Sequence, residues 1–244
     1  MTQPSVSGGV AKGKLLYEGK SKRLYETEDP ELVFLEFTDR ATAFNSKKVG
    51  AIQAKGAINS QVSGRLFKVL ESKGVATHFV RALSDTGILV KRLEVIPVEV
   101  TIRNKAAGRM AELFAIEEGT PLACPVCEFH YKSDPLGDPL INEYHVLSLR
   151  IATEEELKVM RERSFQVNNV LKPFFLERGL ELIDFKVEFG RAKGKILLGD
   201  EISPDTCRLW DVDTGRKLDK DRFLRDLGDV EGAYREVHGR VLRG

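Results

Sequence analysis

Seven residues in the last third of the chain alternate between apolar and charged side chains, and this alternation constrains the fold most. The stretch is Ile183-Asp184-Phe185-Lys186-Val187-Glu188-Phe189. Because successive side chains of a β-strand point to opposite faces, it predicts a strand with Asp184, Lys186 and Glu188 on one face and a packed apolar face behind. A charged face of this kind is either a solvated sheet surface or the wall of a binding site.

A second strand is predicted directly after the first, because a short connection from Gly190 to Gly194 favours a hairpin. If Glu188 lies opposite Leu198, then Glu188 and Asp200 are diagonal neighbours on one face, about 7–8 Å apart. Carboxylate oxygens at that separation can share one or two hard cations such as Mg²⁺. A register shifted by one residue would place Asp200 on the other face, so the predicted metal site depends on this register.

The order of the predicted elements indicates an α+β fold with two lobes. The stretch 121–139 is rich in proline and predicted to be irregular apart from one strand, and Thr153 predicts a helix start as an N-cap followed by three glutamates. Strands are predicted over 14–17, 23–27, 32–38, 77–81, 88–93, 98–103, 128–131, 180–188 and 195–200, and helices over 54–72, 107–114, from 153 onward and over 220–241. Residues 1–13 predict a flexible polar tail, residues 14–90 an antiparallel-sheet lobe and residues 91–244 a larger mixed lobe. Ligand sites favour interfaces between domains, so a nucleotide-sized cleft is expected between the lobes.

The charge balance argues against nucleic acid as the main partner. The chain has 38 Lys and Arg against 37 Asp and Glu, so it has no overall field that would hold a polyanion. No apolar run approaches the roughly 20 residues of a membrane span, and the first 13 residues lack the apolar core of a signal peptide. Three cysteines in 244 residues favour reduced thiols and a cytoplasmic location.

Three further motifs suit the binding of phosphates or other anions. Gly19-Lys20-Ser21-Lys22 lies between two predicted strands and could cover phosphates, although it lacks the glycine spacing of a Walker loop. A strand from Ile96 delivers Arg103 to the start of a predicted helix, where backbone N–H groups bind anions. After Asp200, a polar turn leads to Arg208, which could clamp a phosphate from a loop. Each motif alone is also typical of an ordinary surface turn.

Taken together, four motifs resemble the SAICAR synthetase (phosphoribosylaminoimidazole-succinocarboxamide synthase) family over about 15–241. They are Gly19-Lys20-Ser21-Lys22, Ile96-Pro97-Val98-Glu99 leading to Arg103-Asn104 and Gly108, Asp184 to Gly190, and Gly199-Asp200-Glu201-Ile202-Ser203-Pro204-Asp205. The resemblance implies a two-lobed fold with an ATP cleft and a ligase of purine biosynthesis. This ligase joins L-aspartate to the carboxylate of carboxyaminoimidazole ribotide (CAIR) with Mg-ATP. It also implies a homodimer or higher homo-oligomer.

The resemblance also implies roles for individual residues. Residues implied at the nucleotide are Lys20, Lys22, Val90, Lys91 and Leu93, with Glu188 and Asp200 as the Mg²⁺-ATP carboxylates. Residues implied at CAIR are Arg103 and Arg208 for the ribotide phosphate and Lys186 for the head group, with Lys132 in an active-site loop and Thr42-Ala43-Phe44-Asn45 shaping the pocket. Lys186, Lys132 and Asp200 form the expected catalytic set.

One position departs from the family pattern. The family usually has Ser after the glycine of the Arg-Asn motif, whereas this chain has Arg109. The longer side chain either replaces the hydroxyl contact to the ribotide phosphate with its own donors or points to solvent.

Other patterns favour structural roles. Cys124 and Cys127 form a lone C-x-x-C without the two further paired ligands of a zinc site, so packing is favoured over metal or redox use. The four histidines match no catalytic motif, Trp210 suits an anchor under the Arg208 loop, and 235–243 suits a solvated basic helix face.

Two other classes of function share part of this pattern. A small-molecule kinase would use the same lysines and acidic residues but needs no amine acceptor, and Arg103 with Arg208 favours the ligase. A nucleotide-binding module without activity is the second alternative. The presence of both Glu188 and Asp200 argues against it.

Overall fold

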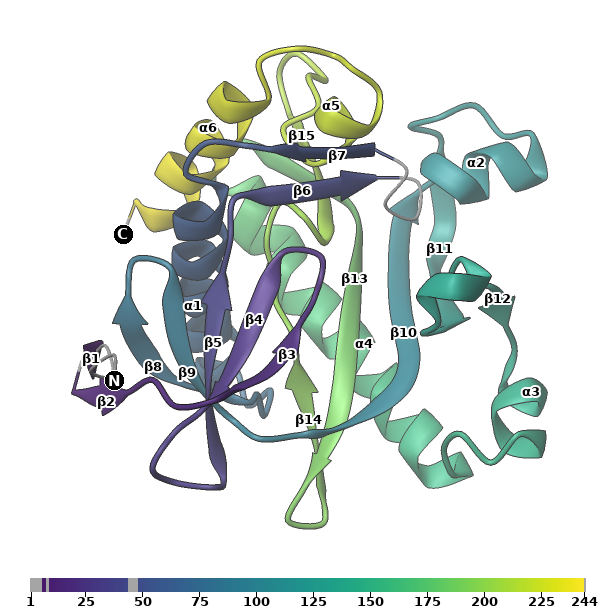
Figure 1. The fold of residues 1–244 in the computed structure, drawn as a ribbon. Coiled ribbons are helices and arrows are strands. Elements are labelled where there is room, and N and C mark those ends of the chain that lie inside the picture. The colour runs from purple at the N-terminus through teal and green to yellow at the C-terminus, as the bar shows by residue number, and fades with distance from the viewer. Residues whose placement is uncertain (1–5, 8, 44–47, 244) are drawn as a thin grey trace.

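The computed structural model describes residues 6–7, 9–43 and 48–243, and two antiparallel sheets organise this part of the chain (Figure 1). The first sheet has the order β3 (Leu15–Glu18), β4 (Lys22–Glu26), β5 (Leu32–Phe37), β9 (Gly87–Lys91) and β8 (Phe79–Ser84). The central strands β5 and β9 are largely buried, as expected for apolar runs covered by other elements.

The second sheet carries the alternating strand at its centre. Its order is β12 (Leu140–Ile141), β11 (Pro121–Tyr131), β10 (Glu94–Lys105), β13 (Leu180–Ala192) and β14 (Lys195–Gly199), and β15 (Cys207–Asp211) also pairs with β13. Phe185, Val187 and Phe189 are buried in the main core. Two short pairs complete the strands: β1 (Val6–Ser7) with β2 (Val10–Ala11), and β6 (Arg40–Ala43) with β7 (Lys48–Ala51).

Two long helices bury the apolar sides of the sheets. Helix α1 (Lys55–Ser72) contacts the first sheet and the C-terminal helix α6 (Val230–Leu242), while α4 (Glu154–Leu176) contacts β10 and β13. Helix α4 begins as predicted, because Thr153 and Glu156 form a capping box. The remaining helices are short: α2 (Gly108–Phe114), η1 (Asp134–Leu136), α3 (Glu143–Ser148) and α5 (Asp221–Leu224). None of the described helices has the length and apolar character needed to span a membrane.

The α+β prediction is confirmed, and several local predictions are corrected. The supposedly irregular Pro-rich stretch is mostly the eleven-residue strand β11, which tolerates Pro125 because that part of the strand lies at the sheet edge. Arg208 lies on strand β15 rather than in a loop. The predicted C-terminal helix is two helices, with Gly228 in the left-handed region between them. The strand pairs β1–β2 and β6–β7 and helix α3 were not predicted.

Candidate functional site

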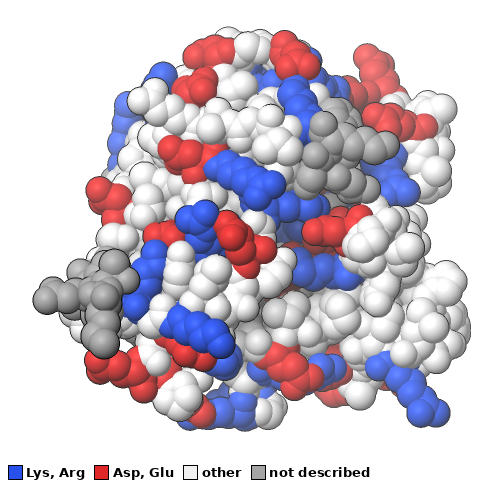
Figure 2. All heavy atoms as spheres, viewed as in Figure 1, with Lys and Arg blue, Asp and Glu red and all other residues white. Residues whose placement is uncertain are grey.

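A cavity of about 700 Å³ opens between the two sheets. Residues of the first sheet, of β10 and β13 and of the turn at 199–206 line it. Figure 2 shows lysine and arginine side chains beside aspartate and glutamate side chains across the middle of this face of the molecule. Opposite charges therefore meet at the cavity. Phosphates or carboxylates of a ligand could bind the lysines there in place of the protein's own acidic groups.

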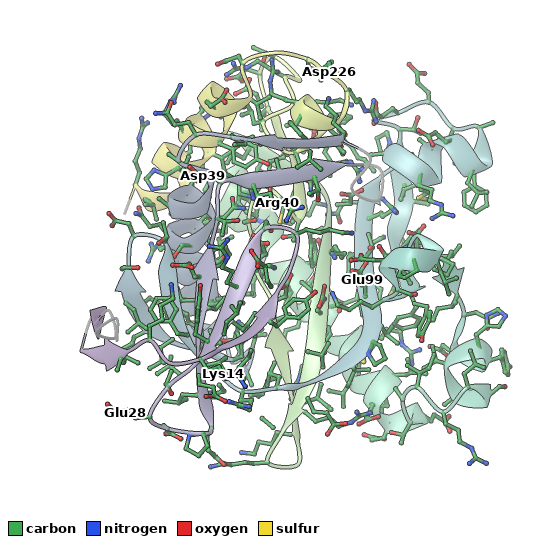
Figure 3. All side chains as sticks on the ribbon, in the orientation of Figure 1. Lys14, Glu28, Asp39, Arg40, Glu99 and Asp226 are labelled. Atoms are coloured by element: carbon green, nitrogen blue, oxygen red, sulfur yellow. The ribbon has the colours of Figure 1, made fainter. Side chains whose placement is uncertain are left out.

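On the wall formed by the second sheet, two glutamates face two lysines. Glu99 of β10, labelled in Figure 3, is the register partner of Glu188 of β13. Lys186 Nζ donates to Glu99 Oε1 at 2.5 Å and to Glu188 Oε1 at 3.3 Å. Lys132 Nζ donates to the same Glu188 oxygen at 2.6 Å. We refer to these four residues with Lys22 and Asp200 as the lysine cluster.

Burial and charge act against each other in this cluster. Burial raises the pKa of Glu99, and the nearby Lys186 only partly offsets this effect. For Lys186 burial alone would lower the pKa, but the charges of Glu188 and Glu99 outweigh it and raise the pKa above the usual value. Lys186 therefore remains a cation at neutral pH.

The predicted register between β13 and β14 is wrong by one residue, yet Asp200 still faces the cavity. Glu188 pairs with Gly199, not with Leu198. Strand β14 ends at Gly199, and Asp200 adopts a left-handed backbone conformation with φ of 56°. Because the chain leaves the strand at this residue, the strict alternation of faces no longer applies, and Asp200 lines the same cavity as Glu188.

Lys22 holds the acidic turn against the first sheet. Its Nζ donates to Asp200 and lies 2.9 Å from Glu201 Oε1. Burial alone would raise the pKa of Asp200, but the charges of Lys22 and Lys186 hold that pKa well below its usual range. Asp200 is therefore a carboxylate at any pH near neutral.

Apolar side chains line another part of the cavity, next to strand β9. Leu24, Val33, Leu35, Val90 and Leu93 all contribute to the lining. Lys91 lines the cavity as well and donates from Nζ to the carbonyl of Thr77 at 3.2 Å. The flat base of a nucleotide could bind here, with the phosphates of the same nucleotide toward Lys20 and Lys22.

Arginines and one shared carboxylate form a second cluster, on the same strands. Arg103 Nη1 and Arg208 Nη1 donate to Asp184 Oδ2 at 2.6 and 2.8 Å. The three residues are register partners across β10, β13 and β15. Arg103 Nε also donates to Glu128, and Arg208 Nε to Asp221. We call Arg103, Arg208 and Asp184 the arginine cluster; it lies outside the lining of the 700 Å³ cavity.

The glycine at the start of α2 makes room for the arginine cluster. Gly108 has φ of 51°, and a Cβ atom there would lie 2.4 Å from Arg208 Nη2. Its neighbour Arg109 is exposed and makes no hydrogen bond or ion pair with the described residues. Thr42 is buried on β6 and is not part of the cavity lining, while Phe44 and Asn45 lie outside the described residues.

Several residues of this region were missed by the sequence analysis. Glu99 belongs to one of the four motifs, but the sequence analysis assigned it no role. The alternation in Val98-Glu99-Val100-Thr101 is the signal that could have placed it on a charged sheet face. His78 lines the cavity, and burial lowers its pKa to about 4, so its ring is neutral. No motif signalled His78 or Lys220, which only the tertiary structure brings to the cavity.

The C-x-x-C pair lacks the surroundings of a metal site. Cys124 is exposed, and burial raises the pKa of Cys127 to about 12, which disfavours its thiolate. Among the described residues, no group of three or more His, Cys, Asp or Glu side chains is arranged to hold a metal ion.

A buried network supports the acidic turn from behind. Asp205 lines the cavity, and its two oxygens accept from Lys55 Nζ and from the Tyr234 hydroxyl, both at 2.6 Å. Lys55 and Tyr234 are almost completely buried on α1 and α6. The turn is thus attached to α1, which packs on the first sheet, and to α6, which packs on α1.

Comparison with known proteins gives a consistent family. The family model described as SAICAR synthetase matches residues 15–241. A protein of Chlorobium phaeovibrioides named phosphoribosylaminoimidazole-succinocarboxamide synthase is 55% identical over 231 residues, which is 95% of this chain and 97% of the relative. A protein of the same name from Coprothermobacter proteolyticus is 52% identical, over 93% of this chain and 97% of the relative.

Solved structures of similar proteins have the same fold. The phosphoribosylaminoimidazole-succinocarboxamide synthase of Ehrlichia chaffeensis superposes with a TM-score of 0.92 at 44% identity, covering 93% of this chain and 98% of that one. A SAICAR synthetase in complex with ADP superposes with a TM-score of 0.91 at 42% identity, covering 95% and 98%.

Proposed function

The chain belongs to the SAICAR synthetase family, and we propose that the cavity and the adjoining arginine cluster are where it carries out the family's reaction. The protein is an ATP-dependent ligase that joins L-aspartate to the carboxylate of CAIR in purine biosynthesis, giving SAICAR, ADP and phosphate. The observation that carries the assignment of the site is that cations of two kinds, lysines and arginines, converge on one charged sheet face.

The chemistry explains why such a face is needed. A carboxylate is a poor acyl donor because its oxygen is a poor leaving group. We propose that ATP phosphorylates the CAIR carboxylate, so that the aspartate amine attacks an acyl phosphate and phosphate leaves. The protein must then align several anions and reduce their repulsion, and positioning with charge neutralisation supplies most of the catalysis.

We propose that the nucleotide binds where the apolar lining meets the first lysines. Val90 and Leu93 would contact the base beside Lys91, and Lys20 and Lys22 would cover the phosphates. In support, Lys22 already binds carboxylate oxygens at this place, and phosphate oxygens can substitute for them.

We propose that Mg²⁺ is held by Glu188 and Asp200. Their donor set fits this ion, because Mg²⁺ usually takes one or two protein carboxylates and completes its shell with water and substrate phosphates. Both carboxylates line one cavity, and each accepts a hydrogen bond from a lysine. When bound, Mg²⁺ would neutralise charge on the triphosphate.

We propose that CAIR lies along the sheet face between the two clusters. Arg103 and Arg208 would bind the ribotide phosphate, and Lys186 and Lys132 the carboxylate that is to be activated. This proposal is supported by Asp184, which fixes both guanidinium groups by one oxygen atom. Arg109 and Thr42 are proposed as more distant contacts from α2 and β6.

We further propose that residues 14–90 act as the nucleotide lobe and residues 91–244 as the lobe that binds CAIR and Mg-ATP. Strand β9 ends at Lys91 and β10 begins at Glu94, which supports a boundary there. A cytoplasmic homodimer or higher homo-oligomer completes the proposal, and size measurement in solution tests the oligomeric state.

The function is tested by omitting one substrate at a time. We expect SAICAR and ADP to form together only when CAIR, L-aspartate and Mg-ATP are all present. Sustained ADP release with a stable phosphorylated product in the absence of aspartate would indicate a kinase instead. Nucleotide binding without turnover under every condition would indicate a binding module.

A further inference from the structure

One lysine of the cavity differs from the others because its side chain has no hydrogen-bond or ion-pair partner within the described part of the chain. Five of the six lysines in the described lining bind an oxygen atom of the protein through Nζ: Lys20, Lys22, Lys91, Lys132 and Lys186. The sixth, Lys220, is half-buried, and its side chain makes no hydrogen bond or ion pair with any residue that the structure describes.

The acidic group that senses the charge of Lys220 forms its hydrogen bonds with other residues. The charge of Lys220 contributes to the lowered pKa of Asp205, so the two groups are electrostatic neighbours. Both Asp205 oxygens are already occupied, by Lys55 at 2.6 Å and by Tyr234 at 2.6 Å. Among the described residues, no side chain forms a hydrogen bond or ion pair with Lys220, so its ammonium group is available to a ligand in the cavity.

The position of Lys220 is fixed on both sides. Its backbone N–H donates to the Pro204 carbonyl at 3.1 Å, which attaches it to the acidic turn. The next residue, Asp221, accepts from Arg208 of the arginine cluster at 3.1 Å. In the same turn, the Thr206 carbonyl accepts from the backbone N–H of Lys186 at 2.8 Å. Lys220 thus stands between the arginine cluster and the strand position that carries Lys186.

The anions of the reaction can be matched to the available cations. This step rests on the proposed function. There the triphosphate is assigned to Lys20 and Lys22, the ribotide phosphate to the arginine cluster and the CAIR carboxylate to Lys186. The carboxylates of the aspartate co-substrate then have no assigned partner, and Lys220 is the one lysine of the described lining without an assigned role. We propose that Lys220 binds a carboxylate of L-aspartate and thereby orients its amine toward the activated carboxylate beside Lys186.

The test compares Michaelis constants for the three substrates in Lys220→Met. A charged hydrogen bond that is lost in a half-buried site raises KM by about 10- to 100-fold. We expect this rise for L-aspartate, with the KM values of CAIR and ATP within about twofold of wild type. Lys220→Arg, which keeps the charge, should recover part of the loss. Lys195→Met, at an exposed position of β14, is the matched control and should leave all three constants unchanged.

Two results would overturn the proposal. An aspartate KM within about twofold of wild type in Lys220→Met excludes the contact, and an equal rise for CAIR or ATP shows that Lys220 does not bind L-aspartate selectively. Lys220→Gln serves as a second variant if the Met variant fails to fold. Wild-type protein without ligase activity would overturn the proposed function itself, so the two failures are distinguishable.

Discussion

The lysine cluster and the arginine cluster share one sheet face but hold their charges differently. In the lysine cluster, the side chains of Lys132 and Lys186 are 40% and 33% exposed and contact glutamates that face the cavity. In the arginine cluster, the Arg103 side chain is only 6% exposed, and both guanidinium groups bind one buried carboxylate. A flexible ammonium can change partners, whereas a planar guanidinium fixed by a carboxylate presents donors in a set geometry.

This difference suggests a division of labour. The lysines and their carboxylates form a set of exchangeable charges, suited to a nucleotide whose phosphates and metal ion arrive and depart. The arginines form a rigid receptor suited to one phosphate group of constant shape. The following experiments test this contrast between the two clusters.

The largest effect is expected from Asp200→Asn. The change removes one negative charge from the proposed metal site while keeping the size of the side chain. We expect kcat to fall by about 100-fold or more with the melting temperature nearly unchanged. Asp213→Asn, at an exposed residue, is the control. Near-normal turnover in the folded Asp200 variant would remove the proposed role in metal binding.

Arg208→Lys tests whether the arginine cluster depends on geometry rather than on charge. Lysine keeps the positive charge but cannot bind Asp184, Asp221 and a phosphate in one plane. We expect KM for CAIR to rise about 10- to 100-fold and KM for ATP to stay within about twofold. Arg81→Lys, an exposed position, should change neither constant. Equal losses for both substrates would place Arg208 at the nucleotide instead.

Asp219 is buried close to the charges of Asp221 and Arg208. We expect it to make the free energy of unfolding depend on pH. Burial and the charge of Asp221 raise its pKa to about 7. Between pH 4 and 7 the folded state therefore holds a proton that the unfolded state releases, and the contribution of Asp219 to stability falls as the pH rises.

The measurement is the free energy of unfolding of wild type and Asp219→Asn at pH 4 and pH 7. Relative to the variant, wild type should lose about 2–4 kcal/mol across this range. Other groups titrate in both proteins and cancel in the difference. A difference that does not change with pH would show that Asp219 is ionised throughout.

The smallest effect is expected from Tyr234→Phe, which removes the hydroxyl that donates to Asp205. One lost hydrogen bond in the core costs about 1–2 kcal/mol of unfolding free energy. Because the same turn carries Asp200, kcat should also fall about two- to fivefold. Tyr144→Phe, at a side chain that is 79% exposed, should alter neither quantity. An unchanged kcat would show that the acidic turn needs no support from α6.

The predictions from sequence succeeded where the pattern was local. Alternation located β13, and the capping residues of α4 located its first turn. They failed where a neighbouring element decided the outcome. The prolines of 121–139 predicted an irregular stretch, but Pro125 lies at a sheet edge, where a strand tolerates proline. The predicted register between β13 and β14 was wrong by one residue, because the turn that joins Ala192 to Lys195 sets the register and alternation along one strand does not reveal it. Alternation also could not foresee that Asp200 takes a left-handed conformation.

The α+β class, the charged face of β13 and the family could all be predicted from the sequence, because alternation, capping and motif order are properties of short stretches of chain. In contrast, folding of the whole chain is what brings Glu99, Lys220 and the Lys55–Asp205–Tyr234 network to the site. These groups come from segments far apart along the chain. Their contacts depend on how helices pack on sheets, and no local spacing records that packing.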